Sequence, residues 1–278
     1  MEACHIVIPT YNRRHVLEHT IPQYLSLGTP LLVVDDGSTD GTADWLTGLG
    51  IRVVRHDRRR GLPAARNTGL RSVTSPWVLF GEDDVIFAPG HATALLKEAA
   101  RLPRCAVVAG SLFTGSSWTL PSERPAWEDG TTLDPSFLLA NFATRIDHAV
   151  PLPTVHACAL VDRQEILAVG GYDERLTNSA FREESDCFAR VWHRGRSVWL
   201  TPATWGVHVR HRLGGGCRGR PEFSAKLANR ASYVRNNSAY VDRHHRLWRH
   251  WAPLSGPGTI KWRYLRRLLG QQLALALR

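Results

Sequence analysis

The sequence lacks the features expected of a membrane-spanning or secreted protein. No stretch approaches the roughly 18 consecutive apolar residues that a membrane span needs. Near the N-terminus, the apolar run 6–8 is cut at once by Pro9, so no signal peptide is expected. The five cysteines are odd in number, widely spread and include no Cys-x-x-Cys pair. This argues against a disulfide framework or a zinc knuckle and is compatible with a reducing cytoplasm.

Several catalytic signatures are missing as well. The sequence has no P-loop, no His-Glu-x-x-His motif and no Gly-x-Ser-x-Gly motif, which excludes those classes of enzyme. Its Gly-x-Gly-x-x-Gly match at 214–219 opens no βαβ unit, so we interpret it as a loop in which Arg218 could close over phosphate. No such motif follows the first predicted strand, which argues against a nicotinamide-dependent oxidoreductase.

Negative charge is scarce in the last quarter of the chain. Residues 211–278 carry 14 Lys and Arg against 2 Asp and Glu, a formal charge of +12, whereas the whole chain carries +10. Such a region attracts polyanions, so a non-catalytic nucleic-acid or membrane-surface binder is one alternative and a solvated basic face is another. Basic helices are predicted at 222–250 and 259–277. The second is amphipathic and suits either docking on the domain, which we favour, or lying on an anionic membrane.

The first 110 residues show a regular alternation of short predicted strands and helices. Pro9 is expected to end the first strand, and Pro22 to limit or kink the first helix. The order predicts a doubly wound α/β fold with a mostly parallel sheet. Strands are predicted at 3–8, 31–35, 51–54, 77–80 and 105–109, and helices from about Arg14 and at 42–48, 62–71 and 91–101.

The second half of the chain is less regular. Segment 111–155 is interpreted as loops that could line a pocket. Beyond it, a strand is predicted at 155–161, a helix at 183–194 and a short strand at 198–200.

Two of the predicted strands end in paired carboxylates. Asp35 and Asp36 end one strand, and Asp83 and Asp84 follow another. In open α/β sheets, ligands bind beyond the carboxyl ends of the strands. Acids there would repel a bare phosphate, but they can hold a divalent cation and, through it, a diphosphate. The combination predicts a nucleotide site, although either pair alone is also typical of a turn.

Two further side chains could carry chemistry. In the helix at 183–194, Glu184 falls in the middle of the apolar stripe and Asp186 on the opposite face. A carboxylate in a partly dry cleft suits a general base. The alternative is a first-turn acid favoured by the helix dipole, which fits Glu183. His208, near a strand end, could bind Mn²⁺ or Mg²⁺, although a lone histidine is more often structural.

Six segments follow one another along the chain: VIPTYNR (7–13), VVDDGS (33–38), GLPAARNTG (61–69), FGEDD (80–84), GGYDE (170–174) and EESD (183–186). In this order they resemble the family 2 glycosyltransferases of the GT-A fold, which transfer sugars from nucleotide diphosphates with inversion. The resemblance covers roughly residues 3–212. Gly81 replaces the first acid of the common D-x-D-D form, which leaves the metal to Asp83 and Asp84, and Glu184 stands where Asp is usual.

The resemblance implies an inverting glycosyltransferase in which Mn²⁺ or Mg²⁺ holds the diphosphate of a nucleotide sugar, with a UDP-sugar expected. Glu184 would deprotonate the acceptor hydroxyl, and Trp118 or Trp127 could stack on an acceptor sugar entering between 111–155 and 170–182. The predicted site residues are, for the nucleotide, Pro9, Thr10, Tyr11, Arg13, Asp36, Arg66 and Asp83; for the metal, Asp84 and His208; and for the acceptor, Trp118, Gly171, Asp173 and Glu183.

The organisation expected from these segments is one GT-A domain over 1–220 and a basic helical extension over 221–278. Within the domain, 1–110 would bind the nucleotide, and 111–220 would bind the acceptor and carry the base. No nucleic-acid partner is expected. The expected location is cytoplasmic, with peripheral contact at the inner membrane face through 259–278 as an option.

Overall fold

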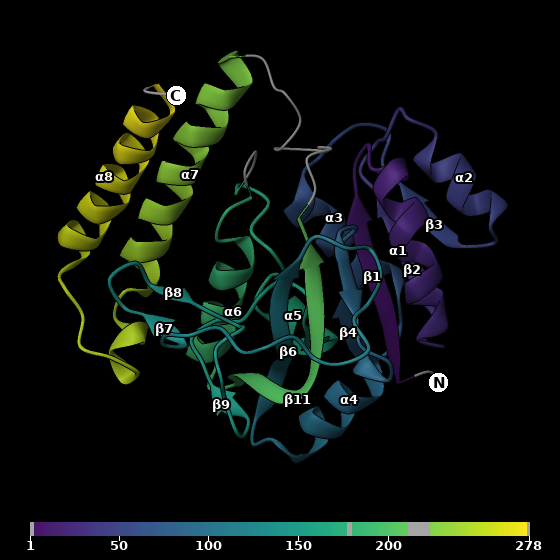
Figure 1. The fold of residues 1–278 in the computed structure, drawn as a ribbon, viewed down its shortest axis with the longest axis horizontal. Coiled ribbons are helices and arrows are strands. Elements are labelled where there is room, and N and C mark those ends of the chain that lie inside the picture. The colour runs from purple at the N-terminus through teal and green to yellow at the C-terminus, as the bar shows by residue number, and fades with distance from the viewer. Residues whose placement is uncertain (1–2, 177–179, 211–222, 277–278) are drawn as a thin grey trace.

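A nine-stranded mixed sheet forms the centre of the computed structural model, which describes residues 3–176, 180–210 and 223–276 (Figure 1). The first four strands in the order below are parallel, as are β6 and β11, whereas β10 and β5 run antiparallel to their neighbours. The predicted doubly wound, mostly parallel α/β fold is therefore confirmed. The order is β3 (Arg52–Arg55), β2 (Leu31–Asp35), β1 (Cys4–Thr10), β4 (Trp77–Phe80), β10 (Leu160–Asp162), β6 (Cys105–Gly115), β11 (Ser197–Val209) and β5 (Val85–Phe87). The ninth strand, β9 (Val150–Pro151), lies outside this order and pairs antiparallel with β11.

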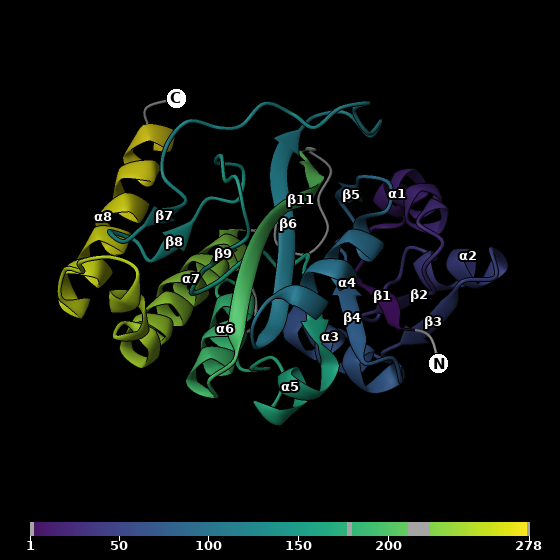
Figure 2. The same cartoon turned by 90° about the horizontal axis from the view of Figure 1, so that it is seen from below.

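Helices cover both faces of this sheet (Figure 2). On β1, Ile6 and Ile8 pack in one apolar cluster and Val7 packs in the other, and all three are fully buried. Strands buried on both faces are apolar throughout, which explains the continuous runs in the sequence. One face carries α1 (Arg14–Ser26), α2 (Thr42–Gly48) and α4 (His91–Arg101), and the other carries α3 (Leu62–Ser72), α5 (Arg163–Ala168) and α6 (Glu183–His193).

The prolines interrupt less than the sequence indicates. β1 continues through Pro9, which pairs with Val34 of β2, so the expected strand end at Pro9 is wrong. The Val7 carbonyl points toward β4, whose pairing with β1 ends at Val7. Pro9 faces the same side two residues later, beyond that pairing, so its missing N–H removes no ladder bond. Likewise, α1 continues past Pro22 to Ser26.

The second half contains longer strands than predicted. β6 and β11 pair in parallel along most of their length, with an irregularity between Leu200 and Trp205. The predicted strand at 155–161 is reduced to β10, and the His156 ring in the segment before it lies 2.8 Å from the Gly110 carbonyl oxygen. The short strand β5, which was not predicted, pairs with the end of β11. Three minor strands complete this half: β7 (Leu133–Asp134), β8 (Leu139–Ala140) and β9 (Val150–Pro151).

The C-terminal helices pack beside α6, away from α1 and α2 (Figures 1 and 2). They are α7 (Phe223–His244), the short 3₁₀ helix η1 (Leu247–His250) and α8 (Pro257–Ala276). Ile260 and Tyr264 of α8 are buried in one apolar cluster with Tyr240, Trp248 and Leu138. The expectation that the amphipathic C-terminal helix docks on the rest of the chain is therefore confirmed for this face.

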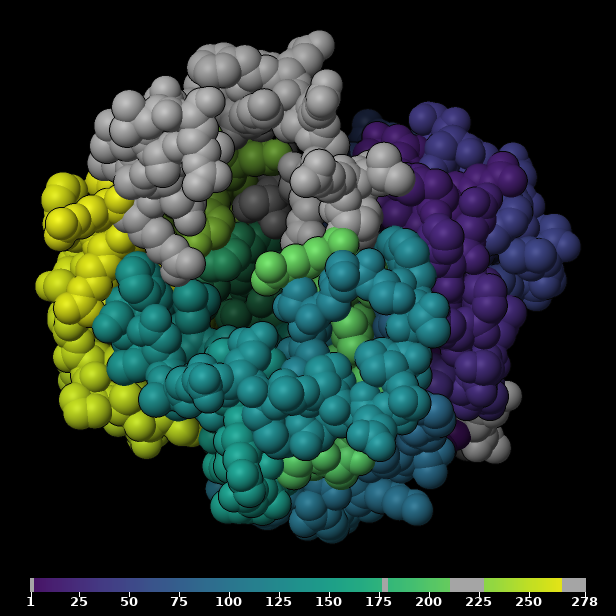
Figure 3. Space-filling view, viewed as in Figure 1, coloured from purple at the N-terminus to yellow at the C-terminus, as the bar shows by residue number. Residues whose placement is uncertain are grey.

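Other expectations concern membranes, thiols and the glycine-rich loop. None of the helices in the described part of the chain has the length and apolar character that a membrane span requires. The four described cysteines, Cys4, Cys105, Cys158 and Cys187, are all free thiols. The loop at 214–219 lies outside the described residues. The surface is hollowed between the C-terminal helices and the N-terminal half of the chain (Figure 3).

Candidate active site

An acidic turn between β4 and β5 meets the end of β11. Glu82, Asp84 and His208 each offer one ligand atom, and these three atoms lie within 4.8 Å of one another. His208 pairs with Val85 across the β11–β5 ladder, which places its ring beside the turn, and its Nε2 is 3.4 Å from Asp84 Oδ1. The structure therefore brings together Asp84 and His208, the two residues predicted to bind metal.

Glu82 is the member of this cluster that the sequence prediction missed, and Asp83 is not part of it. A Cβ atom on Gly81 would lie 2.5 Å from the hydroxyl oxygen of Tyr24, so no acidic side chain fits at position 81. The acid expected there is supplied one residue later, at Glu82. The spacing of two residues between Glu82 and Asp84 was the available signal, and it reproduces the D-x-D pattern with Glu as its first acid.

Arg13 and Thr10, both expected to contact the nucleotide, hold the acidic turn through hydrogen bonds to its carboxylates. Arg13 donates from Nε and Nη2 to Asp83 Oδ1 at 3.0 and 2.8 Å, and from Nη2 to Asp84 Oδ2 at 2.7 Å. Thr10 Oγ1 donates to Asp83 Oδ2 at 3.1 Å. Burial raises the pKa of the Asp83 carboxyl, and Arg13 opposes that rise. Asp83, also expected at the nucleotide, thus has both oxygens engaged within the protein and anchors the turn.

Arg66, which is expected to contact the nucleotide, is buried next to the acidic turn, and its contact with the nucleotide stays a prediction. Its side chain is fully buried among the rings of Phe80 and Tyr172. Its Nε lies 2.8 Å from Glu183 Oε1, and its Nη2 lies 3.2 Å from Glu82 Oε1. Arg66 therefore connects the acidic turn to the first turn of α6.

Glu183, expected to contact the acceptor, is the deeply buried carboxylate of this turn. It is 1% exposed, and its Oε1 forms the ion pair with Arg66. Burial raises the pKa of Glu183, although the positive charge of Arg66 opposes the rise. Its Oε2 has no hydrogen-bond partner in the described structure. We assign Glu183 to holding α6 against Arg66.

Glu184 is only half-buried, whereas Asp186 is 1% exposed, so the expected contrast between the two faces of α6 is wrong. The sequence pattern assumed one covered face, but α7 covers the other face as well. There, Asp186 accepts hydrogen bonds from Arg190, Arg243 and His244. Burial raises the pKa of Glu184, and the positive charges of Arg66 and Arg182 oppose that rise. Glu184 is therefore an accessible carboxylate in a partly dry environment, as a general base requires.

Asp36 holds a loop at the opposite end of the site. It accepts hydrogen bonds from the backbone N–H groups of Arg60 and Gly61, both at 2.8 Å, and its Oδ1 lies 2.8 Å from His56 Nδ1. A carboxylate has about four lone-pair positions, so one remains for a further donor. Beside it, the Arg59 guanidinium lies over the Tyr11 ring, 4.6 Å from its centroid. Contact of Tyr11 and Asp36 with the nucleotide stays a prediction.

A pocket of about 310 Å³ opens next to the cluster of Glu82, Asp84 and His208. His208 and Arg210 of the β11 end form one side, and Glu128 and Asn141 of the 111–155 segment face them. Trp118 does not line this pocket. It stacks on His19 of α1 with ring centroids 4.9 Å apart, so the expected acceptor contact of Trp118 is not supported.

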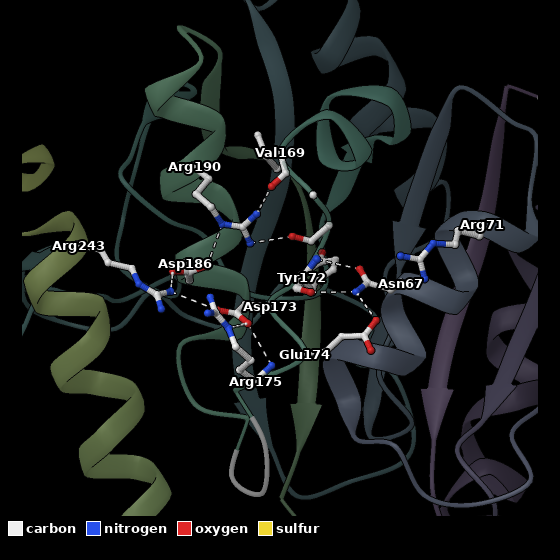
Figure 4. Close-up of a pocket in the computed structure, with 12 residues that line it drawn as sticks. Asn67, Arg71, Val169, Tyr172, Asp173, Glu174, Arg175, Asp186, Arg190 and Arg243 are labelled. Carbon is white, nitrogen blue, oxygen red and sulfur yellow. Dashed lines mark hydrogen bonds and ion pairs between the residues drawn. The ribbon is translucent and has the colours of Figure 1, made fainter.

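A second pocket, of about 510 Å³, contains Gly171 and Asp173, both expected to bind the acceptor (Figure 4). Its lining includes none of the cluster residues and does not include Glu184. Arg175 and Arg243 hold Asp173 and help lower its pKa to about 2. Gly171 has a φ of +72°, and a Cβ there would collide with the Asn67 amide, so glycine is required. Gly171 and Asp173 therefore hold in place the segment of chain next to α6.

The family model described as glycosyl transferase family 2 matches residues 5–158, which is more than half of the chain and includes the whole acidic turn. The chain belongs to glycosyl transferase family 2. The enzyme is therefore a glycosyltransferase, and neither a nicotinamide-dependent oxidoreductase nor a non-catalytic binder describes it.

Similar proteins within the family act on different substrates, according to their names. The N-acetylglucosaminyl-diphospho-decaprenol L-rhamnosyltransferase of Mycobacterium tuberculosis is 26% identical over 284 residues, which is 90% of this chain and 87% of that protein. The validoxylamine A glucosyltransferase of Streptomyces hygroscopicus is 31% identical over 234 residues, which is 74% of this chain but 55% of that protein.

Solved structures confirm the GT-A fold of this glycosyltransferase. The structure of GalNAc-T7 with UDP, GalNAc and Mn²⁺ has a TM-score of 0.66 at 16% identity and matches 93% of this chain and 54% of that one. The structure of Staphylococcus aureus TarS 1–349 with UDP-GlcNAc has a TM-score of 0.55 at 14% identity, and the match covers 87% and 66% of the two chains.

Proposed function

We propose that this glycosyltransferase is a metal-dependent, inverting enzyme that moves a sugar from a nucleoside diphosphate to an acceptor hydroxyl. The observation that carries the proposal is the convergence of Glu82, Asp84 and His208 at the carboxyl edge of the sheet. Arg66 connects this cluster to the first turn of α6, where Glu184 stands. A cation site and a candidate base on two connected elements are the parts that such a reaction needs.

The donor set of the cluster fits a divalent cation. Two carboxylates supply hard oxygen ligands, and the imidazole of His208 supplies a nitrogen, which favours Mn²⁺ over Mg²⁺. Three protein ligands leave coordination positions for diphosphate oxygens. A bound cation would act as a Lewis acid that stabilises the negative charge of the departing nucleotide.

The chain's own residues would do the rest of the work. Arg13 and Thr10 keep Asp84 in place through the buried turn. Glu184 would accept the proton of the acceptor hydroxyl as its oxygen attacks the anomeric carbon from the face opposite the leaving diphosphate. Tyr11 and the remaining acceptor position of Asp36 would meet the base. The 310 Å³ pocket beside His208 would receive a sugar ring.

A UDP-sugar is the proposed donor, because two structural neighbours were solved with UDP or UDP-GlcNAc. The proposed acceptor class is a sugar hydroxyl, and a lipid-linked acceptor is consistent with the decaprenol-linked substrate named for the mycobacterial relative. A cytoplasmic site at the inner membrane face would suit that acceptor.

The test of this proposal is a thermal-denaturation panel of UDP, GDP, dTDP and ADP, each with Mn²⁺ and with EDTA. UDP with Mn²⁺, the proposed donor nucleotide and cation, is expected to stabilise the enzyme most. A ligand that binds only the folded state adds about 2.7 kcal/mol to the free energy of unfolding at 100 times its Kd. Equal stabilisation by UDP in EDTA would contradict the metal dependence. A larger effect of another nucleotide would replace UDP.

A second prediction concerns the outer face of α8. Trp262 is 59% exposed and Leu265 is 39% exposed, beside the cationic side chains of Arg263 and Arg266. An apolar pair flanked by cations suits the interface of an anionic bilayer. We expect the enzyme to sediment with vesicles containing phosphatidylglycerol, and Trp262→Ala to weaken that binding several-fold.

The matched control is Leu49→Ala, since Leu49 is 52% exposed at the end of α2. It should leave sedimentation unchanged. Sedimentation that is equal with purely zwitterionic vesicles, or a Trp262→Ala variant that sediments like the parent, would show that α8 serves only to dock on α7.

A further inference from the structure

Arg182 is a buried cation at the start of α6, two positions before Glu184. It is 2% exposed, and its guanidinium lies against the rings of Phe181, Tyr240 and Tyr264. Its φ is +75°, in the left-handed region that residues other than glycine rarely adopt. A non-glycine residue persists there only when its surroundings hold it. The first turn of α6 therefore depends on how Arg182 is anchored.

Among the described residues, Arg182 donates four hydrogen bonds, and all of them go to uncharged groups. Its Nε donates to Asn237 Oδ1 at 3.1 Å, its Nη1 to the Leu138 carbonyl at 2.7 Å, and its Nη2 to the Phe137 carbonyl at 2.8 Å and to the Tyr264 hydroxyl at 2.6 Å. Within the described residues, no carboxylate forms an ion pair with it. A buried ion usually has an opposite charge beside it, because desolvation without pairing is unfavourable.

These contacts connect three separate parts of the chain at one side chain. Phe137 and Leu138 lie between β7 and β8 in the 111–155 segment, Asn237 lies on α7, and Tyr264 lies on α8. Tyr264 also donates from its hydroxyl to the Phe137 carbonyl. The C-terminal helices are therefore joined directly to the turn that presents Glu184.

We propose that Arg182 is a positioning residue for Glu184, whose buried charge and hydrogen bonds to the C-terminal helices fix the place of that carboxylate. The inference rests on the proposed role of Glu184 as base. The groups that act electrostatically on or with Glu184 are Arg66 of α3, Arg182 and Glu183 at the start of α6, Tyr172 before α6 and Tyr240 of α7.

Two substitutions separate the charge of Arg182 from its hydrogen bonds. Asn237→Asp keeps the shape and the acceptor oxygen but places a negative charge 3.1 Å from Arg182 Nε. Arg182→Lys keeps the charge but loses most of the hydrogen bonds, because an ammonium lacks the planar fork of donors. Ala231→Asp adds the same negative charge at an exposed position of α7 and is the control.

The measurement is the pH profile of kcat/KM for sugar transfer, with UDP binding followed in parallel. In Asn237→Asp, the acidic limb should move up by about 0.5–1 pH unit, which means about three- to tenfold slower transfer below that limb and an unchanged alkaline plateau. In Arg182→Lys, the limb should stay near the parent position, while kcat falls and the KM for donor does not change. Ala231→Asp should match the parent.

An acidic limb that stays in place in Asn237→Asp would overturn the proposal and leave Arg182 a purely structural residue. The failure of the base assignment is distinguishable, because it would appear as near-parent transfer by Glu184→Gln alone. In the Glu184→Gln background, Asn237→Asp should cause no further loss. A further loss of the same size would show that Arg182 acts through another group.

Discussion

Replacing Glu184 with Gln is expected to reduce sugar transfer by about 10²–10⁴-fold, the usual contribution of general acid–base catalysis. The amide has nearly the same volume but cannot accept the acceptor's proton. UDP binding with Mn²⁺ should stay near the parent value, because the proposed metal site consists of Glu82, Asp84 and His208 and does not include Glu184. Initial rates of transfer and the UDP dissociation constant, measured on the same preparation, check the two halves of this expectation.

Asp186→Asn is the matched comparison on the same helix. Asp186 accepts from Arg190, Arg243 and His244, so its neutralisation removes charge-assisted hydrogen bonds in a buried site. The expected result is lower thermal stability with transfer largely retained in the folded fraction. If instead Asp186→Asn is folded and inactive while Glu184→Gln turns over like the parent, Asp186 is the base and Glu184 is not.

The sequence predicted most accurately those elements whose signals are local. The strand at 31–35, the strand at 77–80 and the helix at 91–101 have the predicted bounds, because each is a short apolar or amphipathic run closed by turn residues. The extent of β6 and β11 could not be read in this way. Their length comes from pairing with each other, a contact between residues about 90 positions apart in the chain.

At the site, too, the residue types could be predicted from the sequence, whereas their placement relative to one another could not. The acidic turn and His208 could be identified from residue types at strand ends, and the structure brings them together. The roles of Arg66 and Arg13 could not, because a motif shows that an arginine is present but not which carboxylates surround it. The spacing of Glu82 and Asp84 was visible in the sequence, but the reason for glycine at position 81 was not, since the Tyr24 hydroxyl that prevents a side chain there comes from α1, far away in sequence.

Helix periodicity failed on α6 for a related reason. A stripe of apolar residues indicates one buried face, and it says nothing of a helix that arrives later in the chain to cover the other. Here α7 covers the face of Asp186 and supplies Arg243 and His244 as partners. The last quarter of the chain, which carries no family signature, thus determines the environment of the family's acidic helix.

Asp84→Ala is expected to abolish Mn²⁺-dependent binding of UDP without unfolding the enzyme. Asp84 is 5% exposed and supplies one of the three ligand atoms of the cluster, so its loss leaves only Glu82 and His208. Loss of an outer-shell partner of a metal typically weakens binding 10–100-fold, and loss of a carboxylate ligand should exceed about 100-fold. Arg13 keeps its bonds to Asp83 in the variant, so the buried turn retains a paired cation and the fold should persist.

The measurements are Mn²⁺ titration by electron paramagnetic resonance and UDP-induced thermal stabilisation with and without Mn²⁺. Asp147→Ala, which removes an exposed aspartate that pairs with Arg145, is the control and should bind Mn²⁺ and UDP like the parent. His208→Ala should give a smaller loss than Asp84→Ala, because a neutral imidazole contributes no charge to a divalent cation. An Asp84→Ala enzyme that still binds Mn²⁺ and UDP with parent affinity would remove the acidic turn from the metal site, and the three-residue cluster would then be a fortuitous grouping at a strand end.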